Sequence, residues 1–313
     1  MLPKINPVIQ IAGMKNKKWL QSKVLPNMVK ALEAMNITTH CEVCVGGGGL
    51  RPTRLLKHLK NVVWIINDID SEKENLYKVI RDYPLKLECA CGDILTIIHS
   101  LIEYSIVYEN DRYLNVQESI LQEITSKLQT KEYPRELVDA AVTILQNCHS
   151  ERATTYTVEH QCDAFCKKTA NICPMSHLFQ KCKSVVITRE DLLDVIKKYM
   201  RKKNVVLWID PPYYLSDGGY PENQPGWCYH HKIYEHLIKA KCKFVLFLRI
   251  KASRASGVDV DNEAIDDSLV SFYDNHYKSK NFYYMDMPVN QKGVYTIERV
   301  ITNFAFDGCY EYK

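Results

Sequence analysis

Apolar residues recur with two different spacings in the first third of the chain, and each spacing predicts one kind of element. Helical spacing at 18–35, 50–59 and 72–81 predicts amphipathic helices. Short unbroken apolar runs at 41–45 and 62–67 are typical of buried strands. Helix, strand, helix, strand and helix in this order predict the opening of a doubly wound α/β sheet.

The middle of the chain follows another pattern. Helical repeats dominate 97–146, whereas 148–182 is a mixture of Cys, His, Thr, Lys and Asn, which predicts an irregular segment. Further strands are expected at 185–188, 205–209, 243–248 and 299–304, and further helices at 191–200 and 229–240. We therefore expect a doubly wound, mostly parallel Rossmann-like sheet from 1–90 and 183–313, with an insertion at 91–182 that is mostly helical and then irregular.

Composition and charge favour a cytoplasmic protein. The chain is 46% hydrophobic and 25% charged, as in ordinary globular domains. No apolar run approaches the roughly 20 residues that span a bilayer, and the first residues lack the apolar core of a secretion signal. The formal net charge of +4 permits a polyanionic partner without requiring one. We expect no membrane partner.

Cysteines and histidines gather in the insertion. Cys162, Cys166, Cys173 and Cys182 follow one another at spacings of four, seven and nine residues, which fit no standard zinc pattern. Free thiols are the main interpretation, with a structural zinc site as the lesser alternative, and we assign no metal ligand.

The apolar run at 205–209 ends abruptly in Asp210, Pro211, Pro212 and Tyr213. Ligands of parallel sheets gather at the carboxyl ends of the strands. Because proline has no N–H, the exposed backbone atoms here are carbonyls. A carboxylate, a neighbouring carbonyl and a tyrosine ring suit a flat ring with an exocyclic amine, such as adenine. On this motif alone, a turn with an incidental tyrosine is an equal alternative.

A second ligand-binding pattern lies near the start of the chain. Four glycines at 46–49 follow one predicted strand and precede a helix, as in loops that let the backbone approach a ligand. Asp68 follows the next strand, 20 residues beyond Gly48, where dinucleotide folds place a ribose-binding acid. NAD and S-adenosylmethionine both remain possible ligands, and Asp68 could instead cap the following helix.

Several segments in a fixed order resemble the Dam-like group of N6-adenine-specific DNA methyltransferases. They are Ala12-Gly13-Met14-Lys15, Glu42-Val43-Cys44-Val45-Gly46-Gly47-Gly48-Gly49, Ile66-Asn67-Asp68-Ile69, Asp191-Leu192, Asp210-Pro211-Pro212-Tyr213 and Ile301-Thr302-Asn303-Phe304. The resemblance covers roughly 8–85 and 178–306. The chain departs from the family at Ile11, where the family has tryptophan, at Met14, where it has glycine, and in lacking the usual Arg-rich recognition segment.

The resemblance implies S-adenosylmethionine as methyl donor and DNA as partner. It implies donor contacts from Ile11, Gly13, Lys15, Gly46, Gly48, Asp68, Ile69, Asp191, Leu192 and Asp210. Asp191 would face the donor's adenine amine and Leu192 its ring, although Asp191 serves equally well as an acid at a helix N-terminus. Asp210 and the Pro211 carbonyl would accept the hydrogens of the target amine, and Tyr213 would stack on the flipped base.

We therefore expect a site-specific DNA adenine-N6 methyltransferase that transfers the methyl group directly, in line, to a flipped-out base. Three alternatives stay open: methylation of RNA or of another base amine, a relative that binds DNA or donor without turnover, and a NAD-dependent dehydrogenase. The target sequence, the oligomeric state and a restriction endonuclease partner are left open.

Overall fold

The computed structural model of the protein describes residues 24–46, 61–106, 118–148, 158–211, 227–254, 282–291 and 294–312. The chain divides into two compact units. The first, called here the sheet unit, lies within Asn16–Val45, Asn61–Ile69 and Glu190–Lys313. The described part of the second, the helical unit, comprises Gly46 and residues within Asp70–Arg189.

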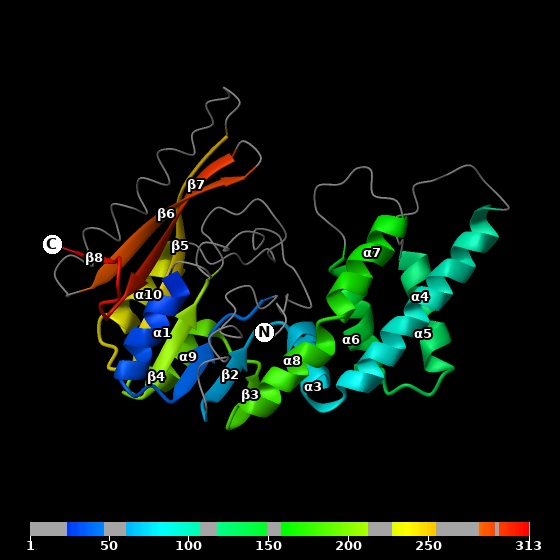
Figure 1. Ribbon diagram of the computed structural model, residues 1–313, viewed down its shortest axis with the longest axis horizontal. Coiled ribbons are helices and arrows are strands. Elements are labelled where there is room, and N and C mark those ends of the chain that lie inside the picture. Colours follow the sequence, from blue (N-terminus) through cyan, green and yellow to red (C-terminus); the bar gives the residue numbers. More distant parts are fainter. Residues whose placement is uncertain are drawn as a thin grey trace. The chain divides into compact units, whose positions relative to one another are not determined.

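The sheet unit contains a mixed sheet (Figure 1). Its strands are β1 (Thr39–Glu42), β2 (Val63–Asn67), β4 (Val205–Ile209), β5 (Lys243–Arg254), β6 (Tyr283–Gln291), β7 (Val294–Thr302) and β8 (Tyr310–Glu311). Within this unit they lie in the order β2-β1-β4-β5-β7-β6-β8. The first four run parallel, whereas β7 is antiparallel to β5 and β6, and β8 is antiparallel to β6. The sheet is thus parallel at one end and antiparallel at the other.

The expectation of a mostly parallel sheet is therefore correct only for part of it. Parallel neighbours need a crossover of a dozen or more residues, whereas antiparallel neighbours can follow one another directly. Strands β6 and β7 are consecutive in the chain and pair along their whole length, from Tyr283 with Thr302 to Gln291 with Val294. This pair makes the sheet mixed.

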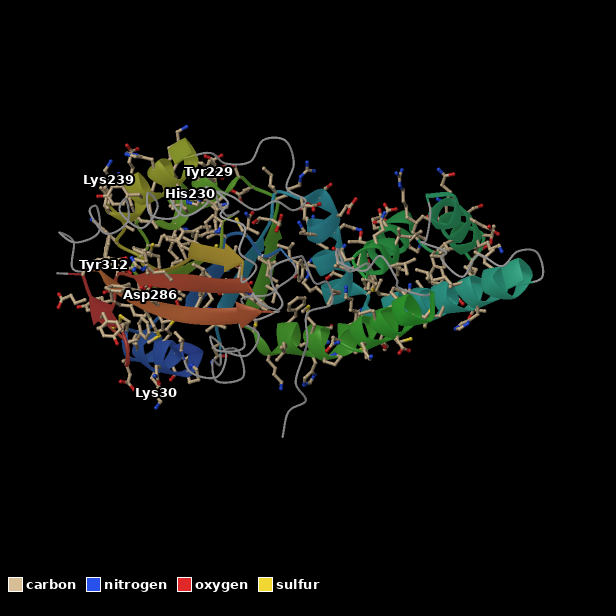
Figure 2. All side chains as sticks on the ribbon, turned by 90° about the horizontal axis from the view of Figure 1, so that it is seen from above. Lys30, Tyr229, His230, Lys239, Asp286 and Tyr312 are labelled. Atoms are coloured by element: carbon tan, nitrogen blue, oxygen red, sulfur yellow. The ribbon has the colours of Figure 1, made fainter. Side chains whose placement is uncertain are left out.

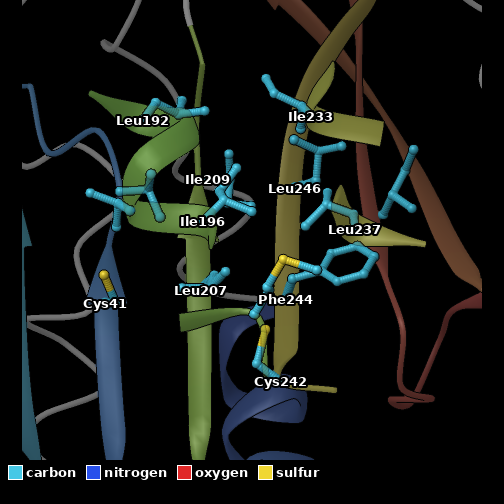
Figure 3. Packing of buried hydrophobic residues seen from close by; sticks show 14 of the residues in the cluster. Cys41, Leu192, Ile196, Leu207, Ile209, Ile233, Leu237, Cys242, Phe244 and Leu246 are labelled. Atoms are coloured by element: carbon cyan, nitrogen blue, oxygen red, sulfur yellow. The ribbon is translucent and has the colours of Figure 1, made fainter. Parts of the chain in front are cut away.

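Helices cover both faces of this sheet. Helices α9 (Leu192–Tyr199) and α10 (Trp227–Leu237) lie on one side and α1 (Leu25–Ala34) on the other, as the two views of Figures 1 and 2 agree. On the α9–α10 side, alternate strand residues such as Cys41, Leu207 and Phe244 pack against helical side chains such as Ile196 and Leu237 (Figure 3). Burying a large apolar side chain contributes about 1.5–3 kcal/mol, so this cluster holds the helices against the parallel strands.

The helical unit contains six described helices and strand β3 (Ser184–Thr188). The helices are α3 (Ser71–Asp82), α4 (Pro84–Ile106), α5 (Glu118–Gln129), α6 (Arg135–Gln146), α7 (Val158–Thr169) and α8 (Ile172–Lys181). The sequence indicated helical repeats up to residue 146, and α4, α5 and α6 confirm them.

The expectation of an irregular segment at 148–182 is wrong for 158–181, where α7 and α8 lie, whereas 149–157 lie outside the described residues. Helix α7 buries Cys162 and Phe165, and α8 buries Met175, Leu178 and Phe179. A buried cysteine packs as a small apolar residue, and most of the remaining positions of α7 hold polar or charged residues. The apolar face was therefore short and partly made of cysteine. Among the described residues, no group of three His, Cys, Asp or Glu side chains could hold a metal ion.

Some expected elements fall outside the described residues. These are the helix at 50–59 and the first part of the helix at 18–35, of which the structure describes α1 from Leu25 onward. None of the helices in the described part of the chain is long and apolar enough to cross a membrane.

Candidate active site

Two of the predicted acids lie level with each other at the carboxyl edge of the parallel strands. In the register of the sheet, Glu42 at the end of β1 pairs with Ile66 on β2 and with Trp208 on β4. Asp68 and Asp210 each follow two residues later, on either side of the point where the chain leaves β1. Strand pairing alone thus brings together residues that are 142 positions apart in the chain.

Asn67 ties three segments together at this edge. Its side-chain amide donates to the carbonyl oxygens of Val43 and Glu190, both at 2.9 Å. Its Oδ1 accepts from the backbone N–H of Glu190 at 2.9 Å. Its own carbonyl oxygen accepts from the N–H of Val45 at 2.9 Å. We call this set of bonds the Asn67 clasp, and it fixes the residues beside it, Asp68 and Asp191.

The sequence analysis did not assign a role to Asn67, although a signal was present. An amide that closes the apolar run of β2 and is 1% exposed must find partners, because an unsatisfied buried polar group costs about 1–3 kcal/mol.

Asp191 caps helix α9. Its Oδ1 accepts from the backbone N–H of Leu193 at 2.8 Å, so the helix-terminus alternative is confirmed. Its Oδ2 accepts from the hydroxyl of Tyr229 on α10 at 3.2 Å. Burial and the neighbouring Asp191 carboxylate raise the pKa of Tyr229 well above its usual range, so the phenol keeps its proton. A carboxylate has about four lone-pair sites, and Asp191 therefore retains acceptor capacity.

Tyr229 had no recognisable signal in the sequence. It is one of several aromatic residues in an amphipathic segment, and its partner lies 38 positions earlier.

Asp68 does not cap the helix that follows it. The N-cap of α3 is Asp70, whose side chain accepts from the N–H of Glu72. The capping alternative for Asp68 is therefore wrong. Asp68 is 9% exposed and lies at the carboxyl edge, where a carboxylate can accept hydrogen bonds from hydroxyl or amino groups.

The other described candidates differ in their exposure. Ile69 is 66% exposed, so its side chain is available to a ligand. Leu192 is 4% exposed and packs in the core of the sheet unit. Asp210 is half-buried and Pro211 is buried. Gly46 has a φ of 49°, in the left-handed region that favours glycine.

Six of the sequence-predicted site residues lie outside the described residues. They are Ile11, Gly13, Lys15, Gly48, Pro212 and Tyr213.

A buried polar pair lies on β1 next to this edge. His40 and Glu42 are two residues apart, so both point to the sheet face opposite Cys41. The indole N–H of Trp64 donates to Glu42 Oε1 at 2.9 Å, and that of Trp208 donates to His40 Nδ1 at 3.2 Å.

Burial makes both members of this pair neutral near pH 7. Burial lowers the pKa of His40 to about 4 and raises the pKa of Glu42 to about 8. Within the described part of the chain, His40 Nε2 and Glu42 Oε2 have no hydrogen-bond partner.

Comparison with known proteins identifies a family. A family model described as D12 class N6 adenine-specific DNA methyltransferase matches residues 21–285. This match confirms the resemblance that the motifs indicated. None of the curated proteins matches the chain.

Proposed function

The chain belongs to the family of D12 class N6 adenine-specific DNA methyltransferases, and from this premise we propose which of its residues carry out the reaction. The general reaction is methylation of the N6 amine of adenine in DNA. The observation that carries the proposal is the placement of Asp68 and Asp210 at one level of the carboxyl edge, on either side of the exit from β1.

The described residues fit the methyl donor S-adenosylmethionine. Asp68, a buried carboxylate that is not the N-cap of α3, would accept hydrogen bonds from the ribose hydroxyls. Asp191 is held by Tyr229 and by the first turn of α9, and its carboxylate would accept a hydrogen bond from the amine of the donor's adenine. The exposed side chain of Ile69 covers one face of that ring. When bound, the donor supplies a methyl group on a positively charged sulfur.

Ile11, Gly13, Lys15, Gly46, Gly48 and Leu192 complete the proposed donor site. Gly46 contributes through its left-handed backbone conformation and Leu192 by supporting Asp191 from the core. The roles of Ile11, Gly13, Lys15 and Gly48 rest on the family resemblance alone.

Asp210 and Pro211 hold the acceptor amine. The lone pair of adenine N6 is delocalised into the ring, which makes the nitrogen a poor nucleophile. The Asp210 carboxylate and the Pro211 carbonyl accept its two hydrogens and favour a pyramidal nitrogen. So held, the nitrogen would attack the methyl carbon in line with the carbon–sulfur bond, which would break with its electron pair on sulfur, without a covalent enzyme intermediate. The proton leaves after the nitrogen has become cationic, so Asp210 need not be a strong base.

The target base leaves the duplex before it reacts. Asp210 follows a buried strand, and a base that is paired and stacked in a duplex cannot reach such a position. Pro212 and Tyr213 complete the pocket, with the tyrosine ring stacked on the extruded base for about 1–3 kcal/mol. Residues 91–182 supply the target-recognition surface.

Transfer of a labelled methyl group from S-adenosylmethionine to mixed-sequence DNA, followed by nucleoside analysis, tests this proposal. The native chain is expected to form N6-methyladenine, and Asp210→Asn is expected to lower the rate by roughly 100-fold to 1,000-fold, as when one preorganised polar group is removed. Asp194→Asn is the matched control, because it neutralises an exposed acid on α9, and it is expected to retain full activity.

Two results would overturn the assignment. One is donor binding by the native chain with no methylation of DNA, which would leave a binding protein. The other is full activity of Asp210→Asn, which would place the acceptor amine elsewhere.

A further inference from the structure

A second charged surface lies at the amino edge of the parallel strands. It consists of Arg201, Lys202 and Lys203, which precede β4, and of Lys239 and Lys241, which precede β5. We call these five residues the amino-edge patch. All five side chains are exposed, and in Figure 2 Lys239 lies at the opposite end of α10 from Tyr229.

Backbone hydrogen bonds hold the two halves of this patch side by side. The N–H groups of Lys241 and Cys242 both donate to the carbonyl oxygen of Met200, at 2.7 and 3.0 Å. The segment after α9 and the segment after α10 are thus joined directly. Cations that are 36 or more positions apart in the chain therefore form one surface.

The patch has no described acidic counterpart. Segments 190–204 and 227–243 together contain nine Lys and Arg but four Asp and Glu. Of these acids, Glu190 pairs with Lys198, Asp194 with Lys197 and Glu235 with His231, and Asp191 caps α9. Among the described residues, none of the five patch cations has an ion-pair partner, and Lys202 lies over the ring of Tyr199 at 4.6 Å.

Helix ends alone do not explain this surface. Cations stabilise the last turn of a helix through its dipole, and the effect falls off within that turn. The cations of the last turn of α9 are Lys197 and Lys198, and both are already paired with acids. The patch residues come after their helices, where the charge is left for an external partner.

The patch is separate from the proposed reaction site. It precedes β4, and Asp210 follows the five residues of that strand. At about 3.3 Å per residue, the two lie roughly 16 Å apart or more, which is about twice the Debye length at physiological ionic strength. Nucleic acid held at the carboxyl edge thus leaves the patch available.

We propose that the amino-edge patch binds the phosphate backbone of a second segment of duplex DNA while the carboxyl edge holds the first. The proposal depends on the proposed function only in that DNA is the substrate. Duplex DNA carries one negative charge about every 1.7 Å, and lysine and arginine contacts release its counterions without regard to sequence. Exposed, flexible cations suit this kind of contact, and the enzyme could thereby pass between segments of a long substrate.

A bridging experiment tests this second site. The full-length enzyme is bound to an immobilised, adenine-containing short duplex in the presence of S-adenosylmethionine, and capture of a labelled duplex made only of G·C pairs is measured. The G·C duplex offers phosphates but no target adenine. The native enzyme is expected to capture it, whereas the variant Arg201→Gln, Lys202→Gln, Lys203→Gln, Lys239→Gln, Lys241→Gln is expected to lose capture per bound enzyme.

Salt dependence gives the size of the effect. Each phosphate contact contributes about 0.9 to the slope of log K against log salt. The slope for the G·C duplex is therefore expected to fall by up to about 4.5 in the five-site variant. Methylation of the short duplex is expected to be unchanged, since no patch residue belongs to the proposed reaction site.

Two further variants test whether capture is lost because of the patch itself, because of the lower net charge or because of misfolding. Neutralising five exposed cations that lie outside both the patch and residues 91–182, namely Lys30, Lys78, Lys86, Lys183 and Lys232, removes the same charge and is expected to preserve capture. A variant with arginine at all five patch positions keeps the charge and is expected to capture as the native enzyme does.

Several outcomes would overturn the proposal. They are no capture by the native enzyme, capture by the five-site glutamine variant, equal loss in the dispersed control, or capture of polyglutamate in place of DNA, which would indicate an acidic protein partner. Failure of the proposed function would look different, because methylation of the short duplex would then be absent in all variants.

Discussion

The two edges of the parallel strands carry opposite charges, and they differ in whether the charged side chains are fixed by hydrogen bonds or exposed. At the carboxyl edge, Asp191 caps α9 and accepts a hydrogen bond from Tyr229, and Asp68 adjoins the Asn67 clasp. At the amino edge, the cations are exposed and have no described ion-pair partner. A reaction needs groups held in one geometry, whereas sequence-independent contact with phosphates needs only charge in the right region. The contrast teaches that side chains held by hydrogen bonds, and not charge alone, distinguish the proposed reaction site from the amino-edge patch.

Breaking the Asn67 clasp is the largest test of this contrast. Asn67→Ala leaves the Val43 carbonyl and the Glu190 backbone without their partners, and each buried unsatisfied group costs about 1–3 kcal/mol. We expect the free energy of unfolding to fall by about 3 kcal/mol or more and methyl transfer to fall with it. Denaturant titration and the methylation assay measure the two effects.

The control for this change is Asn75→Ala. In the native protein, the exposed side-chain amide of Asn75 donates one hydrogen bond to the carbonyl oxygen of Glu136, at 2.7 Å. We expect that variant to lose less than about 1 kcal/mol. Equal losses in the two variants would show that the clasp has no special role.

The pH dependence of the free energy of unfolding tests the buried acid Glu42 at the carboxyl end of β1. Its pKa is raised from 4.5 to about 8 in the fold, so the native protein retains a proton that the unfolded chain releases, and stability falls as pH rises through this window. For His40 the pKa is lowered from 6.5 to about 4, so stability rises between those values and is complete above them.

Between pH 6.5 and 8, therefore, only Glu42 of this pair changes the stability. Glu42→Gln cannot ionise and keeps an acceptor for the Trp64 indole. We expect its stability to rise by about 2 kcal/mol relative to the native protein over that range, since one pKa unit corresponds to about 1.4 kcal/mol. Denaturant titrations at both pH values measure it, and Glu235→Gln, at an exposed acid on α10, should show no such trend.

Shortening Ile69 tests whether the carboxyl edge uses an exposed apolar side chain. Ile69→Ala is expected to raise the donor Kd about 10-fold, which corresponds to about 1.4 kcal/mol, and to leave stability nearly unchanged. Leu85→Ala removes a side chain of similar exposure, 68% against 66%, in the helical unit. Calorimetric titration with S-adenosylmethionine separates the two, and a donor Kd unaffected by Ile69→Ala would remove this residue from the site.

The smallest expected effect is that of Tyr229→Phe. Loss of the phenol hydroxyl frees one oxygen of Asp191 and loosens its position. We expect a rise in KM for the donor of about 2-fold to 5-fold, in line with a hydrogen bond worth about 0.5–1.5 kcal/mol, at unchanged kcat. Tyr199→Phe, which changes a partly buried tyrosine of the same unit, is the control. An unchanged KM would limit Tyr229 to packing.

Local pattern predicted those elements whose apolar signal was complete. The run at 205–209 coincides with β4, and all five of its residues are buried. Helix α7 was missed because only Cys162 and Phe165 form its buried face among many polar residues. Helix α8 was missed although Ile172, Met175, Leu178 and Phe179 are buried at helical spacing, because it was grouped with the Cys- and His-containing segment. Strand β6 was missed as well, since Asp286, Pro288 and Asn290 interrupt its apolar residues.

The residues of the site divide in the same way. Asp68, Asp191 and Asp210 follow or precede recognisable elements and belong to motifs, so the sequence could indicate them. Asn67 and Tyr229 act through partners that are 123 and 38 positions away. No local spacing encodes such contacts, because they depend on how the strands are ordered in the sheet.

The Asn67 clasp also bears on how new specificities could arise. The chain leaves the sheet unit after Ile69 and returns to it at Glu190, and the clasp joins these two points within the sheet unit itself. Hydrogen bonds therefore join the two ends of the intervening segment of 120 residues, so that the segment can be exchanged as a unit. Given the target-recognition role proposed above for residues 91–182, exchange of this segment between relatives, with Asn67 and Glu190 kept, is expected to alter target choice and to leave the proposed reaction site in place.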